Sequence, residues 1–261
     1  MRRTEPRPRL VVAIAVVAAV LLAVPFVGLL IAAPWSTLLD RLTSDVVADA
    51  LTLSLFASLL ATVLALFLGV PLGWWLARTS GPVVPVVRAV ATLPIVVPPV
   101  VGGAALLFAL GRRGFVGEPL EAATGLVLPF SIWAVVVANT FVAVPFVVLT
   151  IEGAVRTADR GVEDAAATLG ASPHQVFTRI TLPALRSALW AAGLLAWARA
   201  FGEFGATITF AGNLQGRTQS LPLAVFVALE SDRDTAIAIS VLMMLVSAVV
   251  LVVLRDRWWS R

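Results

Sequence analysis

Six apolar runs, each close to the length of one membrane crossing, organise the chain. A helix needs roughly 20 residues to bridge about 30 Å of hydrocarbon. The runs cover residues 10–33, 51–77, 89–110, 127–151, 184–203 and 235–254. This pattern predicts an all-α integral membrane protein with about six transmembrane helices, in a single domain over residues 1–261. The first run follows several arginines, as a secretory signal does, but it exceeds the roughly 7 to 15 apolar residues of such a signal, so we expect it to be retained.

Composition supports this assignment, and the arginines orient it. The chain is 60% hydrophobic and 13% charged. Cytoplasmic segments of membrane proteins carry an excess of basic residues. With both termini inside, the arginines of the cytoplasmic segments are Arg2, Arg3, Arg7, Arg9, Arg78, Arg88, Arg156, Arg160, Arg179, Arg186, Arg255, Arg257 and Arg261. Those of the external segments are Arg41, Arg112, Arg113, Arg217 and Arg233. We therefore expect a multi-pass protein of the cell (cytoplasmic) membrane with cytoplasmic termini and a long cytoplasmic loop over residues 152–186.

Two of the predicted spans carry unusual residues. The third contains the segment LPIVVPP, in which Pro94, Pro98 and Pro99 remove amide donors and force a break in the helix. Backbone that is not helical at membrane depth is tolerated only against protein or a water-filled cavity. The break therefore belongs either to a kinked packing helix or to the wall of a cavity or gate. In the fourth span, Asn139 either bonds a neighbouring helix or lines a pathway.

The cytoplasmic loop has the signals of two short helices. Residues 164–169 favour a helix that stops at Gly170, the residue type that adopts the left-handed C-terminal position at least cost. Ser172 and Gln175 have the spacing of a capping box for a second helix, which Pro183 is expected to end. Such a loop either lies on the lipid surface or docks into a protein groove. Its alanine-rich, nearly neutral first half favours docking, because surface helices usually carry a basic face.

The spacing within this loop resembles the EAA loop of permease subunits of ATP-binding-cassette importers, E-A-A-x3-G-x9-I-x-L-P. One position departs from that pattern, because an aspartate, preceded by Glu163, stands where the family has glutamate. The resemblance implies that this loop couples the permease to a separate ATPase. The matching residues are Asp164, Ala165, Ala166, Gly170, Ile180, Leu182 and Pro183.

Two further segments, LPIVVPPVVGG and ARAFGEFGATITFAGNLQGRTQSLPLAVFVALE, are similar to molybdate transport permease subunits, with sulfate permeases somewhat further off. Together the matches cover residues 51–254. The resemblance implies the type I importer permease fold and a homodimer with two copies of an ABC ATPase subunit. It also implies a periplasmic or lipid-anchored molybdate-binding protein. The transported anion would then be molybdate or, with the same charge and nearly the same size, tungstate.

The fifth run ends with an arginine and a glutamate four residues apart, Arg199 and Glu203. They lie about 40° apart on a helical wheel, on the side that also carries Ala188, Ala192, Ala196 and Ala200. Because an intramembrane charge costs roughly 2.5 to 3.5 kcal/mol, this face should point at protein or water. The two charges either neutralise each other as a structural pair or, with Gly202, Gly205 and the prolines Pro98 and Pro99, form a gate.

The residue types that are missing restrict the function. All 19 basic residues are arginine, there is no cysteine, and His174 is the only histidine. A phosphate-binding loop of the Walker type, a two-histidine zinc site and thiol chemistry are therefore not encoded. We expect no enzyme activity, metal or cofactor, and no nucleic-acid binding. A stand-alone secondary transporter, the main rival, would usually show internal repeats or acids along an ion path. An intramembrane enzyme would need a nucleophile and base that the spans lack.

Overall fold

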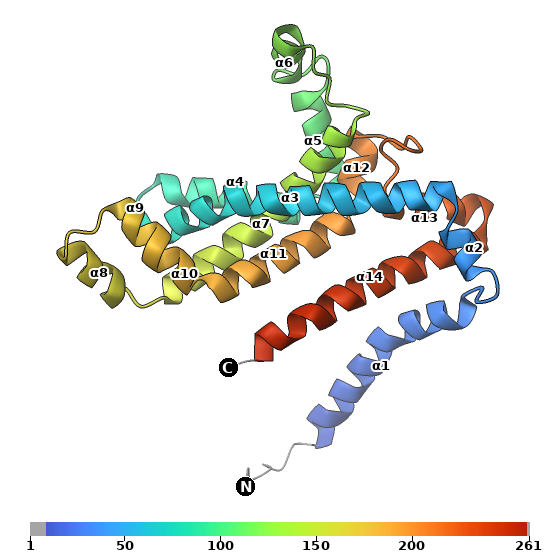
Figure 1. The fold of residues 1–261 in the computed structure, drawn as a ribbon, viewed down its shortest axis with the longest axis horizontal. Helices are drawn as coiled ribbons and strands as arrows, with labels where there is room; N and C mark the ends of the chain where they lie inside the picture. Colours follow the sequence, from blue (N-terminus) through green and yellow to red (C-terminus); the bar gives the residue numbers. More distant parts are fainter. Residues whose placement is uncertain (1–8, 260–261) are drawn as a thin grey trace.

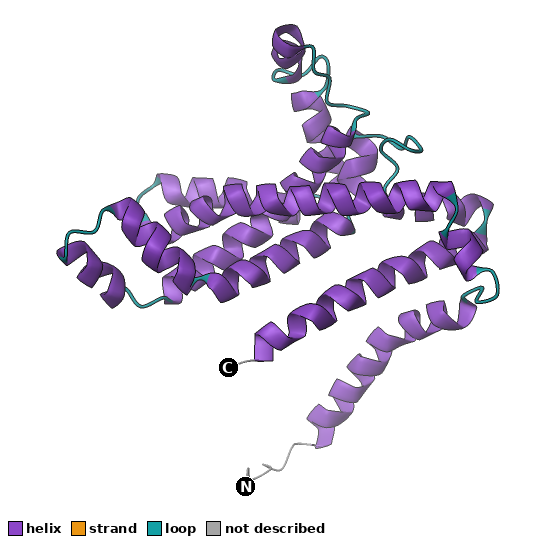
Figure 2. Cartoon of the chain, viewed as in Figure 1, coloured by secondary structure: helices purple, strands orange, loops and turns teal. Residues whose placement is uncertain are grey.

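The computed structural model describes residues 9–259, and within residues 253–259 only the backbone. Arg2, Arg3, Arg7 and Arg261, which contribute to the predicted orientation, lie outside the described residues. Between residues 9 and 259 the chain folds entirely into helices and loops, without a strand (Figure 2). The helices are α1 (Arg9–Ala32), α2 (Leu38–Leu42), α3 (Asp45–Arg78), α4 (Val83–Val96), α5 (Pro99–Leu110), α6 (Gly117–Thr124), α7 (Ile132–Thr157), α8 (Gly161–Thr168), α9 (Pro173–Val176), the π-helix η1 (Phe177–Thr181), α10 (Leu182–Ala184), α11 (Arg186–Phe201), α12 (Gly205–Phe210), α13 (Leu221–Ser231) and α14 (Arg233–Trp259).

Four of these helices, α1, α3, α7 and α14, are long and apolar enough to cross a membrane singly. Two bent pairs bring the number of spans to six if each pair is one span: α4 with α5, and residues 173–184 with α11. The predicted boundaries need correction at several ends. α3 begins six residues before the apolar run, at Asp45, because the helix continues upstream through a segment that is apolar except for Asp45 and Asp49. α7 begins five residues later than predicted, at Ile132, where the Ser131 side chain accepts a hydrogen bond from the Ala134 amide and caps the helix.

The third predicted span is sharply broken. α4 ends at Val96, α5 starts at Pro99, and the two helices meet at 118°. The break falls at Pro98, which stands at the N-cap of α5, whereas Pro94 is accommodated inside α4. A bend beyond a right angle takes α5 away from the direction of α4, so residues 89–110 are not one straight crossing. The prolines thus redirect the chain.

The core is a three-helix packing of α3, α7 and α11, which lie side by side in Figure 1. Every fourth residue of α3 in the interface is small, and so is every fourth residue of α11. Backbones can therefore approach closely: a methyl group added at Gly73 would lie 2.7 Å from the Val148 carbonyl oxygen of α7. The two stripes consist of Ala57, Ala61, Ala65, Gly69 and Gly73 on α3, and of Ala188, Ala192, Ala196 and Ala200 on α11.

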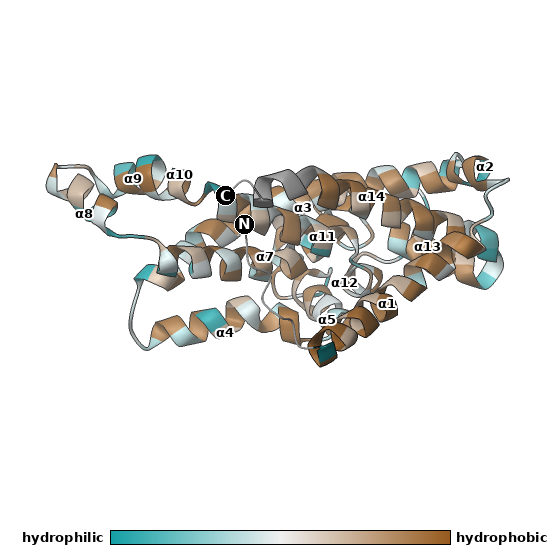
Figure 3. Ribbon diagram, turned by 90° about the horizontal axis from the view of Figure 1, so that it is seen from below, coloured by the Kyte–Doolittle hydropathy of each residue, from teal (hydrophilic) through white to brown (hydrophobic). Residues whose placement is uncertain are grey.

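The remaining helices surround this core on different sides. Helices α8 to α10 project at one end, and α2 and α13 lie at the other (Figure 1). Helices α1 and α14 run from the end with α2 back toward the end with α8 to α10. Figure 3 shows strongly hydrophobic residues along α1 and α14, and α1 has no buried residue. Such an exposed apolar surface is expected for helices that face lipid or another membrane helix.

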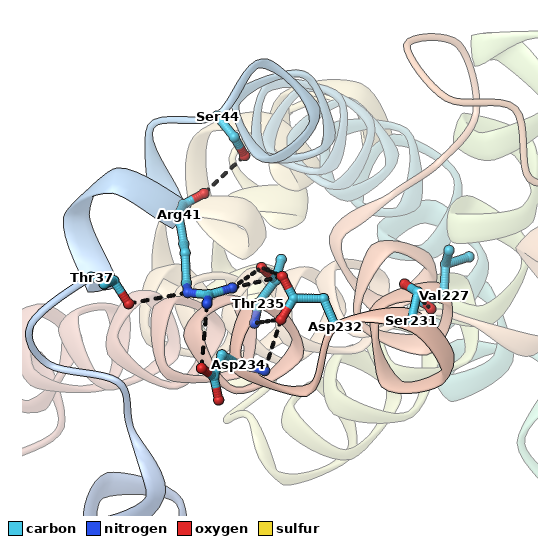
Figure 4. A network of polar contacts seen from close by, with 8 residues as sticks. All are labelled: Thr37, Arg41, Ser44, Val227, Ser231, Asp232, Asp234 and Thr235. Carbon is cyan, nitrogen blue, oxygen red and sulfur yellow. Dashed lines mark hydrogen bonds and ion pairs between the residues drawn. The ribbon is translucent and has the colours of Figure 1, made fainter.

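A polar network ties α2 to the start of α14 at the far end (Figure 4). The Arg41 guanidinium lies 2.6 Å from Asp232 Oδ2 and donates to the Thr235 hydroxyl at 2.7 Å. Asp232 also caps α14 by accepting from the Asp234 and Thr235 amides. Hydrogen bonds from the Thr235 hydroxyl and amide, with the nearby Arg41, lower the pKa of Asp232 to about 2. Because a depressed carboxyl pKa stabilises the fold above the unfolded pKa, this contribution is complete above pH ~4 and is lost as pH falls through about 2.

The close approach of α3 to α7 generates a prediction. Gly73→Ala should destabilise the protein by about 1 to 3 kcal/mol, because the new methyl group meets a backbone carbonyl that has no room to move. Gly153→Ala is the matched control: Gly153 also lies in a helix, α7, but a methyl group there meets nothing within 4 Å. Thermal unfolding in detergent measures both variants. Equal unfolding temperatures for the two would contradict the packing account.

Candidate coupling loop and gate

The first part of the predicted cytoplasmic loop forms α8, which ends at Thr168, two residues before Gly170, where the sequence predicts the stop. Gly170 has φ +91°, in the left-handed region. Its amide donates to the Ala167 carbonyl, and the Ala171 amide donates to the Ala166 carbonyl, each at 3.0 Å. These two bonds are those of a Schellman motif, which satisfies the last carbonyls of a helix. A methyl group at Gly170 would meet nothing within 4 Å, so the backbone conformation alone favours glycine.

The second part of the loop starts with the expected capping box. The Ser172 hydroxyl accepts from the Gln175 amide at 3.3 Å, and the Gln175 side chain accepts from the Ser172 amide at 2.9 Å. The predicted end of this helix at Pro183 holds to within one residue. The helix runs on through η1 and α10 to Ala184, and the chain then turns by 72° before α11.

The residues of the EAA pattern divide into exposed and packed positions. Asp164, Ala165 and Pro183 are exposed, whereas Ala166, Ile180 and Leu182 are half-buried. Beside them Leu169, at the C-terminal end of α8, is 89% exposed, and Val162 on the same helix is also exposed. α8 therefore presents a carboxylate and apolar side chains outward, a combination suited to contact with another protein.

Glu163, rather than Asp164, makes the ion pair of this loop. Its Oε2 lies 2.6 Å from Arg78 Nη2 at the end of α3, and its Oε1 accepts from the Thr181 hydroxyl at 2.7 Å. Sequence reasoning noted Glu163 but assigned it no role. The adjacent Asp164 occupies the acidic position of the EAA pattern. The contact of Glu163 with α3 joins segments that are far apart in the sequence, so no local pattern indicates it.

At the opposite end of α11, Arg199 and Glu203 form an ion pair between Nη1 and Oε2. The Glu203 side chain is 1% exposed and that of Arg199 is 27% exposed. The second carboxylate oxygen of Glu203 accepts from the Ala206 amide at 2.7 Å. Glu203 thus uses both oxygens: one neutralises Arg199 and the other caps the short helix α12. A buried carboxylate requires such pairing.

This ion pair lies well inside the helix bundle. Ala206 and Phe210 of α12 share a packed cluster with Ala57 of α3. At 1.5 Å per residue, Ala57 stands about 18 Å from the first residue of α3 and about 32 Å from its last. The chain therefore stops being helical at Gly202, within the depth that α3 spans, and Glu203 satisfies an amide that the break exposes.

The structure also brings the break in α11 against the break at Pro98 and Pro99. A methyl group at Gly205 would lie 2.8 Å from the Pro99 Cβ, and one at Gly103 would lie 2.7 Å from the Ala206 carbonyl oxygen. α5 and α12 thus pack at backbone distance. Gly202 is exposed, and a methyl group there would have room.

Asn139 of α7 is buried next to this junction. The Thr207 hydroxyl of α12 donates to Asn139 Oδ1 at 3.5 Å, so Asn139 bonds a neighbouring helix, one of the two roles open from the sequence. Thr207 was missed, since nothing in the sequence indicated that α12 is a separate helix. Among the residues that the structure describes, no three histidine, cysteine, aspartate or glutamate side chains gather as metal ligands would.

Comparison with known proteins places this geometry in a family. Residues 69–259 match the family model of the binding-protein-dependent transport system inner membrane component. The chain is 45% identical over 93% of its length, and 92% of the relative, to the molybdenum transport system permease protein ModB of Mycobacterium bovis. It is 36% identical to ModB of Escherichia coli strain K12, over 81% of this chain and 93% of that one.

A solved structure has the same fold. A chain of a bacterial alginate ABC transporter, in complex with an alginate pentasaccharide-bound periplasmic protein, superimposes with a TM-score of 0.73 at 15% identity, over 93% of this chain and 91% of that chain. At this identity the likeness concerns the fold alone. From the match over residues 69–259 and its relatives, the chain belongs to the inner membrane components of binding-protein-dependent transport systems, a family of multi-pass permeases.

Proposed function

We propose that this chain is the permease subunit of an ATP-driven importer of molybdate. In this proposal two copies of the chain form the pathway across the membrane. Two copies of a separate ATPase bind their cytoplasmic side, and a periplasmic or lipid-anchored binding protein delivers the anion from outside. Support for the anion comes from relatives at 36 to 45% identity that are named as molybdenum permeases. Tungstate and sulfate, also dianions, are the alternatives that an experiment has to separate.

The observation that carries the proposal is the shape of the cytoplasmic loop. α8 ends in a Schellman turn at Gly170, and a capping box at Ser172 starts the next helix, so the projection has a defined geometry. Leu169 is exposed at its tip. A rigid projection with outward apolar and acidic side chains fits a groove on another protein. Because the chain has no lysine and hence no Walker loop, the groove belongs to the subunit that hydrolyses ATP.

The ion pair between Arg199 and Glu203 supports a gate within this pathway. It lies where the break between α11 and α12 meets the break between α4 and α5, next to Gly205 and Pro99. A bare carboxylate would repel a dianion, so the pairing keeps the path passable and masks the arginine in the closed state. The Arg199 side chain is 27% exposed, so in this proposal part of it can reach the anion when the gate opens.

ATP hydrolysis in lipid nanodiscs tests the function. The chain is purified alone, with its ATPase, and with its ATPase and binding protein, the last loaded with molybdate, tungstate or sulfate. We expect no hydrolysis by the chain alone and the strongest stimulation with the molybdate-loaded binding protein. Hydrolysis by the chain alone would contradict the assignment as permease subunit. Stimulation by the sulfate-loaded form only would replace molybdate by sulfate.

Replacing Gly170 tests the coupling loop. Gly170→Val should cost about 1 to 2 kcal/mol at the turn, because a β-branched residue disfavours positive φ. Stimulated ATP hydrolysis and transport should then both fall while membrane insertion stays normal. Gly170→Asn is the matched control, since asparagine tolerates the left-handed region, and it should retain most of the activity. Wild-type coupling in Gly170→Val would rule out this role.

A double-mutant cycle tests the gate. Arg199→Gln and Glu203→Gln should each destabilise the protein by about 3 kcal/mol or less, since each leaves one charge unpaired at a largely buried site. The double variant should lose less stability than the sum of the losses in the two single variants. As a gate, the pair should also change ATP hydrolysis without binding protein, measured in variants that fold normally.

The more exposed pair Arg112 and Glu121 is the control for this cycle, and its two substitutions should be additive within about 0.5 kcal/mol. If the Arg199 and Glu203 variants fold normally and leave both transport and basal hydrolysis unchanged, the pair is structural and no gate.

A further inference from the structure

The link between the coupling loop and the membrane helices runs through the last turns of α3. Arg78 is the last residue of α3, and Glu163 is in the first turn of α8. Their side chains are 13% and 17% exposed, and Arg78 Nη2 lies 2.6 Å from Glu163 Oε2. At this degree of burial the pair is less screened by salt than a surface pair.

A second bond fixes the orientation of the same carboxylate. Glu163 Oε1 accepts from the Thr181 hydroxyl of η1 at 2.7 Å, and Thr181 is buried. Glu163 therefore joins three elements, α8, η1 and α3. One oxygen of Glu163 pairs with Arg78 and the other accepts from Thr181. A shift of α8 therefore either moves both partners or breaks one of these two interactions.

One turn earlier on α3, an aromatic contact binds the same loop. The Trp74 ring meets the Phe177 ring of η1 edge to face, with centroids 5.4 Å apart. Such pairs contribute packing and a preferred orientation. We define these five residues, Trp74, Arg78, Glu163, Phe177 and Thr181, as the α3 clamp.

A pocket of about 690 Å³ lies beside the end of α7 and the loop. Residues of α7, α8, η1, α10 and α11 line it, and Glu163 and Thr181 are among them. Its lining includes Ala154, Thr157, Val162, Ile180 and Ala184. Phe177 and Leu182 of the loop pack against a core cluster that includes Ile151 and Val155 of α7. The pocket leaves α8 room to move, while Glu163 ties α8 to α3 and η1.

We propose that the α3 clamp, and the ion pair of Arg78 with Glu163 above all, transmits movement of α8 to α3 and is required to couple ATP hydrolysis to transport. Glu163 and Arg78 are positioning residues in this proposal. The movement passes onward because α3 packs along its length on α7 and α11 through small residues. The proposal rests on the proposed function, since it assumes that an ATPase moves α8.

The measured quantity is the ratio of anion transported to ATP hydrolysed, in proteoliposomes that contain the chain with its ATPase and binding protein. Glu163→Gln and Arg78→Gln should each lower this ratio by roughly fivefold or more. The ratio in the double variant should be no lower than in the more impaired single variant, because either substitution alone already removes the ion pair. Arg156→Gln is the matched control. It removes another cytoplasmic arginine whose partner, Glu152, keeps Arg88, and the ratio should not change.

An unchanged ratio in the two single variants would contradict the role of the α3 clamp in coupling. Losses of the ratio that multiply in the double variant would contradict it as well. A variant that assembles poorly but has the wild-type ratio in the complex that does form also overturns it, because the residues are then structural only. Failure of the proposed function has a different signature, since the wild-type complex itself would then show no ATP-driven uptake.

Discussion

Close backbone packing of α3, α7 and α11 is the constraint on which the rest of this structure depends. Lipid tails are as apolar as leucine, so membrane helices gain little from hydrophobic burial and associate through tight van der Waals contact. The small residues at every fourth position of α3 permit that contact, down to Gly73 against the Val148 carbonyl. The same helix carries Arg78 at its C-terminal end and, well inside its N-terminal half, Ala57 beside α12. The frame thus holds the coupling loop and the buried ion pair at fixed positions along one element.

The breaks between α11 and α12 and between α4 and α5 lie beside these packed helices. Backbone groups exposed inside a membrane need partners, and Glu203 supplies one by accepting from the Ala206 amide while it pairs with Arg199. At the other break, Pro98 and Pro99 have no amide to satisfy, so proline is suited to the start of α5. The two breaks meet where Gly205 lets α12 approach Pro99. Irregular backbone, a charge pair and backbone-distance contacts therefore coincide at one place, the site of the proposed gate.

Much of this architecture could be predicted from the sequence, because its causes are local. Apolar length indicated the spans, and the positive φ of Gly170 and the capping box at Ser172 follow from signals within a few residues. The rest depends on contacts between distant segments. The 118° bend, the separate helices α12 and α13, and the partnership of Glu163 with Arg78 are set by packing across the bundle.

The central claim of this account is that the chain forms a pathway for an oxyanion and receives its energy from another polypeptide. Uptake of radiolabelled molybdate into proteoliposomes tests it most directly, with ATP on the side of the ATPase and the binding protein on the other. The account predicts uptake against a gradient only when the chain, the ATPase, the binding protein and ATP are all present. Uptake by the chain alone, driven by a proton or sodium gradient and indifferent to ATP, would contradict it.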